Sequence, residues 1–216
     1  MTQSRTRRIS MLAGASAVVL GMWAGRTVSP PAVAAPQSPS PAFAVIPAGA
    51  FAIVPGQSSV TFAVPDNRGG FSGHTAQLSG RVDIEGGPGE TYTARITGSI
   101  DARSLTTNNG VRDSAMHATS LQTARYPTIT FTGTATAKPG LGVHPFPAAI
   151  RGRLTIKDVT REAEFTGTVL AIANQYVADA TATVRMADYG IPYPRAFIFV
   201  ARDPVTVTLH IVARGP

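Results

Sequence analysis

Apolar and polar residues alternate along much of this chain, and this alternation limits the folds that it can adopt. In residues 204–212 (PVTVTLHIV), valine, leucine and isoleucine take every second position, with threonine and histidine between them. Successive side chains of a β-strand point to opposite faces, so a period of two predicts a strand with one apolar and one polar face.

The same pattern recurs along most of the chain, between turns rich in Gly, Pro and Asn. The further alternating or apolar runs are Phe51–Val54, Val60–Val64, Ala76–Ile84, Tyr92–Ile100, Thr128–Thr136, Ala149–Ile156, Glu162–Ile172 and Tyr176–Met186. Roughly nine strands joined mostly by short turns predict an all-β antiparallel meander, and closure into a barrel of about eight strands removes its exposed edges. A β-sandwich stays open as the alternative, because strand counting does not separate the two folds.

One segment, Arg112–Phe131, interrupts this pattern. It is polar and rich in small residues, and Pro127 holds Tyr126 away from helical geometry, so the segment has a definite end. We predict that it forms a short helical insertion that helps to close one end of the barrel.

We consider two interpretations of three polar residues in this insertion. Arg112, Asp113 and His117 could form a polar rim around the head group of a ligand. Alternatively, an Arg112–Asp113 pair caps a short helix that starts near Asp113, and His117 lies in solvent.

The first 34 residues have the order of an export signal. Arg5, Arg7 and Arg8 precede the uncharged run Ile9–Gly25, and small residues follow up to Ala34, after which we predict cleavage. The adjacent arginines also permit twin-arginine export, while the general secretory route stays open.

A retained N-terminal anchor is the alternative to cleavage, and it would associate the protein with the membrane. Either way, the sequence predicts a periplasmic or secreted protein. Residues 35–47 are rich in Pro, Ala and Ser and predict a linker, so we expect the folded domain to span residues 48–216.

The net charge of +7 comes largely from this N-terminal region. The first 47 residues hold four of the 19 basic residues and no acid, which leaves 15 basic and 12 acidic residues, a net charge of +3, for the remainder. These charges are dispersed, so the sequence predicts no nucleic-acid binding. The absence of Cys excludes disulfides and thiolate metal sites.

The sequence predicts no catalytic, metal or cofactor site. His74, His117, His144 and His210 are far apart and match no metal-binding spacing, and no GxSxG motif follows the N-terminal segment. An exported hydrolase assembled from distant Ser, His and Asp residues stays an alternative, because such triads are recognised by geometry.

Four short blocks follow one another in order between Phe51 and Ala213. They are Arg112-Asp113, residues 126–131 (YPTITF), residues 152–156 (GRLTI) with Val159-Thr160, and residues 186–190 (MADYG). Each is ordinary strand-and-turn sequence alone, but their order and spacing resemble the YceI-like family of exported lipid-binding domains.

The chain departs from that family's pattern in three places. Gln57-Ser58 stands where the family commonly has His-Ser, and Val64-Pro65-Asp66 lacks a further histidine. Leu78, where an aromatic residue is usual, precedes Ser79-Gly80. We therefore carry no head-group contact over to these positions.

The resemblance implies a lipocalin-like antiparallel barrel with a short helical insertion, whose interior takes up a long isoprenoid, quinone-like or fatty chain. Such a ligand requires a dry channel and no catalytic residues. The candidate lining residues are Phe62, Val64, Leu78, Ile129, Phe131, Leu154, Ile156, Phe165, Phe197, Phe199, Val207 and Leu209. The alternative is that these side chains fill the core of a structural or interaction domain.

Overall fold

The computed structural model describes residues 48–86, 91–138, 145–193, 195–196 and 199–216, all within one compact unit, Ser40–Pro216. The predicted signal peptide and linker, residues 1–47, lie outside the described residues. In the described part of the chain, no helix is long and apolar enough to span a membrane.

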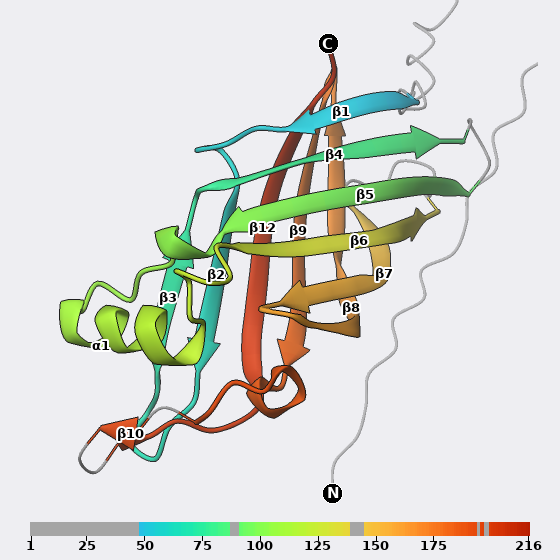
Figure 1. The fold of residues 1–216 in the computed structure, drawn as a ribbon. Coiled ribbons are helices and arrows are strands. Elements are labelled where there is room, and N and C mark those ends of the chain that lie inside the picture. The colour runs from blue at the N-terminus through green and yellow to red at the C-terminus, as the bar shows by residue number, and fades with distance from the viewer. Residues whose placement is uncertain (1–47, 87–90, 139–144, 194, 197–198) are drawn as a thin grey trace, which may run out of the picture. The chain divides into compact units, whose positions relative to one another are not determined.

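Eight antiparallel strands form a closed barrel (Figure 1). In order around the barrel they are β1 (Gly49–Ile53), β4 (Leu78–Glu85), β5 (Tyr92–Asp101), β6 (Thr128–Ala137), β7 (Phe146–Ile156), β8 (Val159–Ile172), β9 (Gln175–Val184) and β12 (Val205–Arg214). The ring closes where β1 pairs with β12, through Ala52↔Arg214 and Ile53↔Ala213. The structure therefore confirms the predicted barrel, and the chain does not form the alternative β-sandwich.

Further strands extend this barrel. β2 (Ser59–Val64) pairs with β12, and β3 (Phe71–Thr75) pairs with β2, while β10 (Arg195–Ala196) and β11 (Phe199–Val200) form a separate hairpin. Alternation did not predict β3, because its sequence FSGHT begins with its only large apolar residue.

Helical turns occupy two connections. Between β5 and β6 lie η1 (Ala102–Ser104), α1 (Gly110–Ala115) and a short π-helical turn, η2 (Met116–Ser120). The turn η3 (Met186–Tyr189) follows β9, where the sequence had predicted strand as far as Met186. Figure 1 shows α1 beside β2 and β3, at the end of the barrel where β5 finishes and β6 begins.

A buried serine fixes the bend between β1 and β2. Ser58 is fully buried, and its Oγ donates to the Val212 carbonyl at 3.2 Å and accepts from the Val212 amide at 2.9 Å. Both groups of Val212 are thereby satisfied at the point where β12 changes its partner from β2 to β1. The serine of the Gln57-Ser58 pair thus has a structural role in this chain.

We predict that Ser58→Ala destabilises the protein by about 1–3 kcal/mol, because it leaves a buried Val212 amide without its acceptor. Urea unfolding monitored by circular dichroism measures this change. The matched control is Ser79→Ala, whose hydroxyl makes an exposed contact with Ser99 and whose loss should change stability by less than about 0.5 kcal/mol. Equal effects of the two substitutions would contradict the role given to Ser58.

Candidate ligand-binding site

The barrel encloses a cavity of about 820 Å³. Its lining is formed mainly by alternate, inward-facing residues of the barrel strands, with further residues from β2, from the helical insertion and from the segments that follow β2 and β9. On β6 the inward residues Ile129, Phe131, Ala135 and Ala137 are only half-buried, although they face the interior. Inward side chains stay partly accessible because the space in front of them is not filled, so the interior is a cavity and not a solid core.

An aromatic cluster forms the floor of the cavity at one end. Phe51, Tyr92, Phe146 and Tyr176 are buried together, and the rings of Phe51 and Tyr176 meet edge to face with centroids 4.7 Å apart. Burial raises the pKa of Tyr176 far above its ordinary value of 10.0, so its hydroxyl stays neutral over the physiological range. The floor is therefore built of large aromatic rings and is uncharged.

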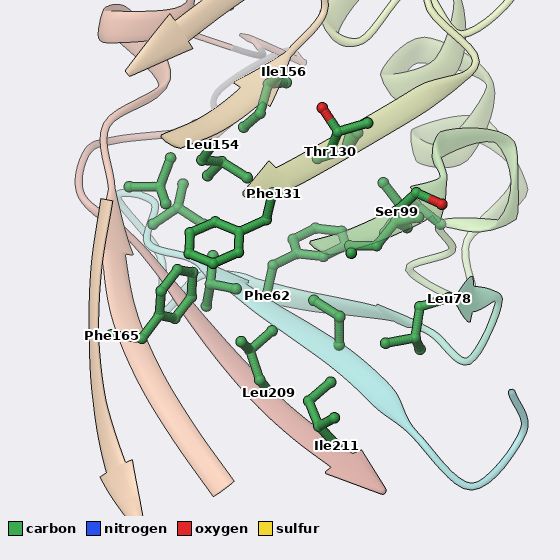
Figure 2. A pocket seen from close by; sticks show the side chains of 18 of the residues that line it. Phe62, Leu78, Ser99, Thr130, Phe131, Leu154, Ile156, Phe165, Leu209 and Ile211 are labelled. Carbon is green, nitrogen blue, oxygen red and sulfur yellow. The ribbon is translucent and has the colours of Figure 1, made fainter. Parts of the chain in front are cut away.

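The middle of the cavity has an aromatic wall, seen in Figure 2, in which Phe62, Phe131 and Phe165 lie close together. The Phe131 and Phe165 rings are perpendicular, with centroids 5.6 Å apart. The Phe131 ring lies over the cross-strand pair Gly133–Gly152, where an added Cβ would come within 2.8 Å of the ring. These two glycines let the ring lie against the sheet and leave the centre of the barrel open.

Ten of the twelve predicted lining residues lie around this cavity. The structure brings together Phe62, Val64, Leu78, Ile129, Phe131, Leu154, Ile156, Phe165, Val207 and Leu209 around the one cavity. Phe197 lies outside the described residues, and of Phe199 only the backbone, in β11, is described. Contact between these residues and a ligand stays a prediction.

The helical insertion covers the opposite end from the aromatic floor. Val111, Ala115, Met116 and Leu121 line the cavity, and Val111 is also 85% exposed, which marks the place where the cavity meets solvent. The insertion thus lies over this end of the barrel, as the sequence predicted, and contributes apolar surface to the cavity.

Arg112 is the member of the predicted polar rim that lines the cavity. Its guanidinium lies 4.4 Å from the centre of the Phe71 ring, and its Nε donates to Thr107 Oγ1 at 2.8 Å. Asp66 also lines this end, but its carboxylate accepts from the amides of Gly70 and Arg68, which lower its pKa. The positive charge of Arg112 is therefore held beside the entrance.

Asp113 anchors the insertion and does not line the cavity, so its prediction as a rim residue is not supported by its position. Its carboxylate accepts from Thr106 Oγ1 at 2.7 Å, from the Thr107 amide at 2.8 Å and from Thr107 Oγ1. Burial alone would raise the pKa of Asp113, but these hydrogen bonds outweigh it and lower the pKa below 3.8.

The alternative reading of these residues is also wrong in detail. The side chain of Asn109 caps α1 by accepting from the Arg112 amide at 3.0 Å, and Arg112 contacts Thr107 in place of Asp113. His117 is half-buried in η2, away from the cavity lining, and its buried Nδ1 has no hydrogen-bond partner among the residues that the structure describes. It is therefore neither a rim residue nor fully solvated.

The floor and part of the wall were not predicted from the sequence. Tyr92, Ile96 and Ile100 line the cavity from β5, and Phe146 lines it from β7. The first three share one face of the run predicted as Tyr92–Ile100, so alternation could have nominated them. Phe146 had no such signal, because prolines flank it on both sides.

We predict that Asp113→Asn loosens the helical insertion while the barrel stays folded. The loss of a charged acceptor should reduce the free energy that protects the amides of residues 105–121 by about 1 kcal/mol. This is less than the roughly 1.5–3 kcal/mol of a hydrogen bond to a charged group, because this carboxylate is partly exposed. Hydrogen exchange followed by mass spectrometry measures this change.

The same residue gives a pH dependence. The pKa of Asp113 is lower in the folded protein than its ordinary value of 3.8. The contribution of Asp113 to the stability of the insertion is therefore complete above pH 3.8 and is lost as the pH falls through the folded pKa. Protection factors of the insertion should fall in this window in the native protein but not in Asp113→Asn. The exposed, Arg81-paired Asp83 provides a control, and an effect of Asp83→Asn on the insertion equal to that of Asp113→Asn would contradict the assignment.

Known structures share this fold at low sequence identity. BcnA from Burkholderia cenocepacia matches with a TM-score of 0.60 and 16% identity, over 74% of this chain and 98% of that chain. A polyisoprenoid binding domain from Saccharophagus degradans, implicated in plant cell wall breakdown, matches with a TM-score of 0.56 and 15% identity, over 79% of this chain and 100% of that chain. No curated protein matches the sequence.

The match to a family model shows more directly than these structures which family the chain belongs to. The model of the YceI-like domain matches residues 51–213, from the floor residue Phe51 to the barrel-closing Ala213. This range includes the barrel, its helical insertion and the cavity. The chain therefore belongs to the YceI-like domain family.

Proposed function

We propose that this protein binds a long apolar chain, of isoprenoid, quinone-like or fatty type, inside its barrel and outside the cytoplasm, without catalysing a reaction on it. The observation that carries the proposal is the cavity of about 820 Å³ in a closed barrel, lined almost throughout by apolar side chains. Its size falls within the range of ligand pockets, about 300–1,000 Å³.

The energetics of such binding need no specific polar contact. At about 30 Å³ for each water-sized group, a cavity of about 820 Å³ holds roughly 27 methylene-sized groups. At about 0.8 kcal/mol for each buried methylene, a filling chain gains roughly 20 kcal/mol. This gain exceeds the association cost of roughly 4–15 kcal/mol, so apolar burial alone supports tight binding.

Family membership and one structural neighbour support the choice of ligand class. The Saccharophagus degradans protein is a polyisoprenoid binding domain, and isoprenoids are long apolar chains of the kind that the cavity suits. Arg112 beside the entrance is placed to attract a polar or anionic end group, while the floor is aromatic and carries no charge.

The positions and hydrogen-bond partners of the polar groups support binding without catalysis. The carboxylates of Asp66 and Asp113 hold turns of the backbone around the entrance. His210 Nδ1 lies 2.7 Å from Asp179 Oδ1, but this pair is on the outer face of β12 and β9, since the neighbouring Leu209 and Ile211 line the cavity. It is therefore not placed to act on a chain inside the barrel.

The proposed location follows from the N-terminal sequence. Arg5, Arg7 and Arg8 precede an uncharged run and small residues, the order of an export signal. We expect the intact mass of protein from producing cells to correspond to a chain that starts at Ala35. Residues 1–34 retained in a membrane fraction would favour the anchor, and an uncleaved protein in the cytoplasm would contradict export.

The binding proposal is tested with a charge placed inside the barrel. Ile96 lines the cavity, and its neighbour Thr97 points outward between Arg81 and Thr132. We expect excess geranylgeraniol to raise the melting temperature of the native protein and of Thr97→Glu, by an amount equivalent to about 2–3 kcal/mol at a hundredfold excess over Kd. Ile96→Glu should lose this shift, because an ionised carboxylate in the channel is incompatible with an apolar ligand.

Thr97→Glu is the matched control, since it adds the same charge on the opposite face of the same strand. Circular dichroism establishes that both variants are folded. A native protein whose melting temperature does not respond to prenyl alcohols, quinones or fatty acids would contradict the proposed function.

A further inference from the structure

Gly98 leaves a gap in the wall of the cavity, and the packing of the protein does not require a glycine at this position. It lies on β5 between the lining residues Ile96 and Ile100, and it lines the cavity itself. Among the atoms of the described residues, a Cβ built at Gly98 would meet none closer than the carbonyl oxygen of Ser79, at 4.0 Å. No other part of the chain that the structure describes fills the space in front of Gly98, which therefore belongs to the cavity.

The cross-strand partner Gly80 shows the contrast. A Cβ there would lie 2.2 Å from the Thr97 carbonyl oxygen and 2.9 Å from the Ile53 side chain, so close packing requires a glycine. Gly98 has no such clash, and its φ lies outside the left-handed region that favours glycine. Neither sterics nor backbone conformation accounts for a glycine at position 98.

A glycine inside a strand is unfavourable relative to alanine. Where packing and conformation do not call for one, it often marks a place at which a ligand comes close to the backbone. The other neighbour of Gly98, Phe131 on β6, directs its ring over Gly133 and Gly152. The wall is therefore recessed at Gly98, between Gly80 and the Phe131 ring.

The cavity continues from Gly98 down to the aromatic floor. Gly98 lies six positions along β5 from the floor residue Tyr92, a length of about 20 Å. Between them the lining residue Ala94 pairs with Ala135 on β6, which also lines the cavity. Both side chains are small, so they leave the cavity open down to the floor.

Resting on the proposed function, we propose that Gly98 and Ala135 determine which chains the cavity accepts. Gly98 admits a chain against the backbone of β5 midway along the barrel, and Ala135 keeps the deep half free for its end. The ligand class is then a single long chain with roughly 27 methylene-sized groups inside the barrel, as the volume of about 820 Å³ allows. Shorter chains bind without reaching the floor.

The test compares two variants with prenyl alcohols of increasing length: geraniol, farnesol, geranylgeraniol and solanesol. In the native protein, affinity should rise with length until the floor is reached. Ala135→Phe should leave geraniol binding within about twofold and weaken geranylgeraniol at least about tenfold, the equivalent of losing roughly two buried methylene groups. Displacement of a fluorescent fatty-acid probe gives each Kd.

Gly98→Leu should weaken farnesol and all longer alcohols by at least about a hundredfold, the equivalent of roughly four lost methylene groups. It should do so with an unchanged or higher melting temperature, whereas Gly80→Ala should lower the melting temperature. Thr97→Leu adds the same side chain on the outer face and should leave every Kd unchanged.

The outcomes separate the two proposals. A native protein that takes up no prenyl alcohol overturns the proposed function and this inference with it. If the native protein binds the series but Gly98→Leu keeps the native affinities, or Ala135→Phe weakens all lengths equally, only the length selection is overturned. A loss of stability in both Gly98→Ala and Gly98→Leu would show that the space at Gly98 is needed for packing, and would also overturn the inference.

Discussion

The pairing of β1 with β12 closes the sheet into a ring, and the enclosed interior of the protein exists because of this pairing. Closing the ring gives the backbone groups at the ends of these strands a partner and converts one face of every barrel strand into an interior. The closing contact is short, with Ala52 and Ile53 opposite Arg214 and Ala213. Ser58 reinforces it, because its hydroxyl satisfies both backbone groups of Val212.

The interior created in this way is packed at one end and open in the middle. Phe51, Tyr92, Phe146 and Tyr176 fill the floor with large rings, whereas Gly98, Ala94 and Ala135 keep the bore clear above it. An empty apolar cavity forgoes the dispersion contacts that a filled core would make, and so lowers stability. A ligand chain restores those contacts, which links the form of the barrel to binding.

Much of the fold could be predicted from the sequence, because alternation reports directly which residues share a face. The runs at 92–100, 128–136 and 204–212 became β5, β6 and β12, and their inward residues line the cavity. Lining positions such as Phe131 and Leu209 could be nominated because a large apolar side chain on an alternating strand must face inward.

Other features of the site could not be predicted, for physical reasons. The strand β3 carries too few apolar residues to show a period, and Gly98 has no side chain by which alternation could identify it. The roles within the insertion depend on local hydrogen bonds: Asn109 caps α1, and Asp113 binds the Thr106–Thr107 turn. Spacing alone could not separate these roles from a polar rim at Arg112, Asp113 and His117.

Binding of an apolar chain inside the barrel can be measured by native mass spectrometry of the protein, purified without detergent from the cells that produce it. We expect a population that carries one apolar molecule per chain, released by organic solvent and identified as a single long chain. A protein that leaves the cell empty, and that takes up no prenyl alcohol, quinone or fatty acid afterwards, would contradict the proposed binding.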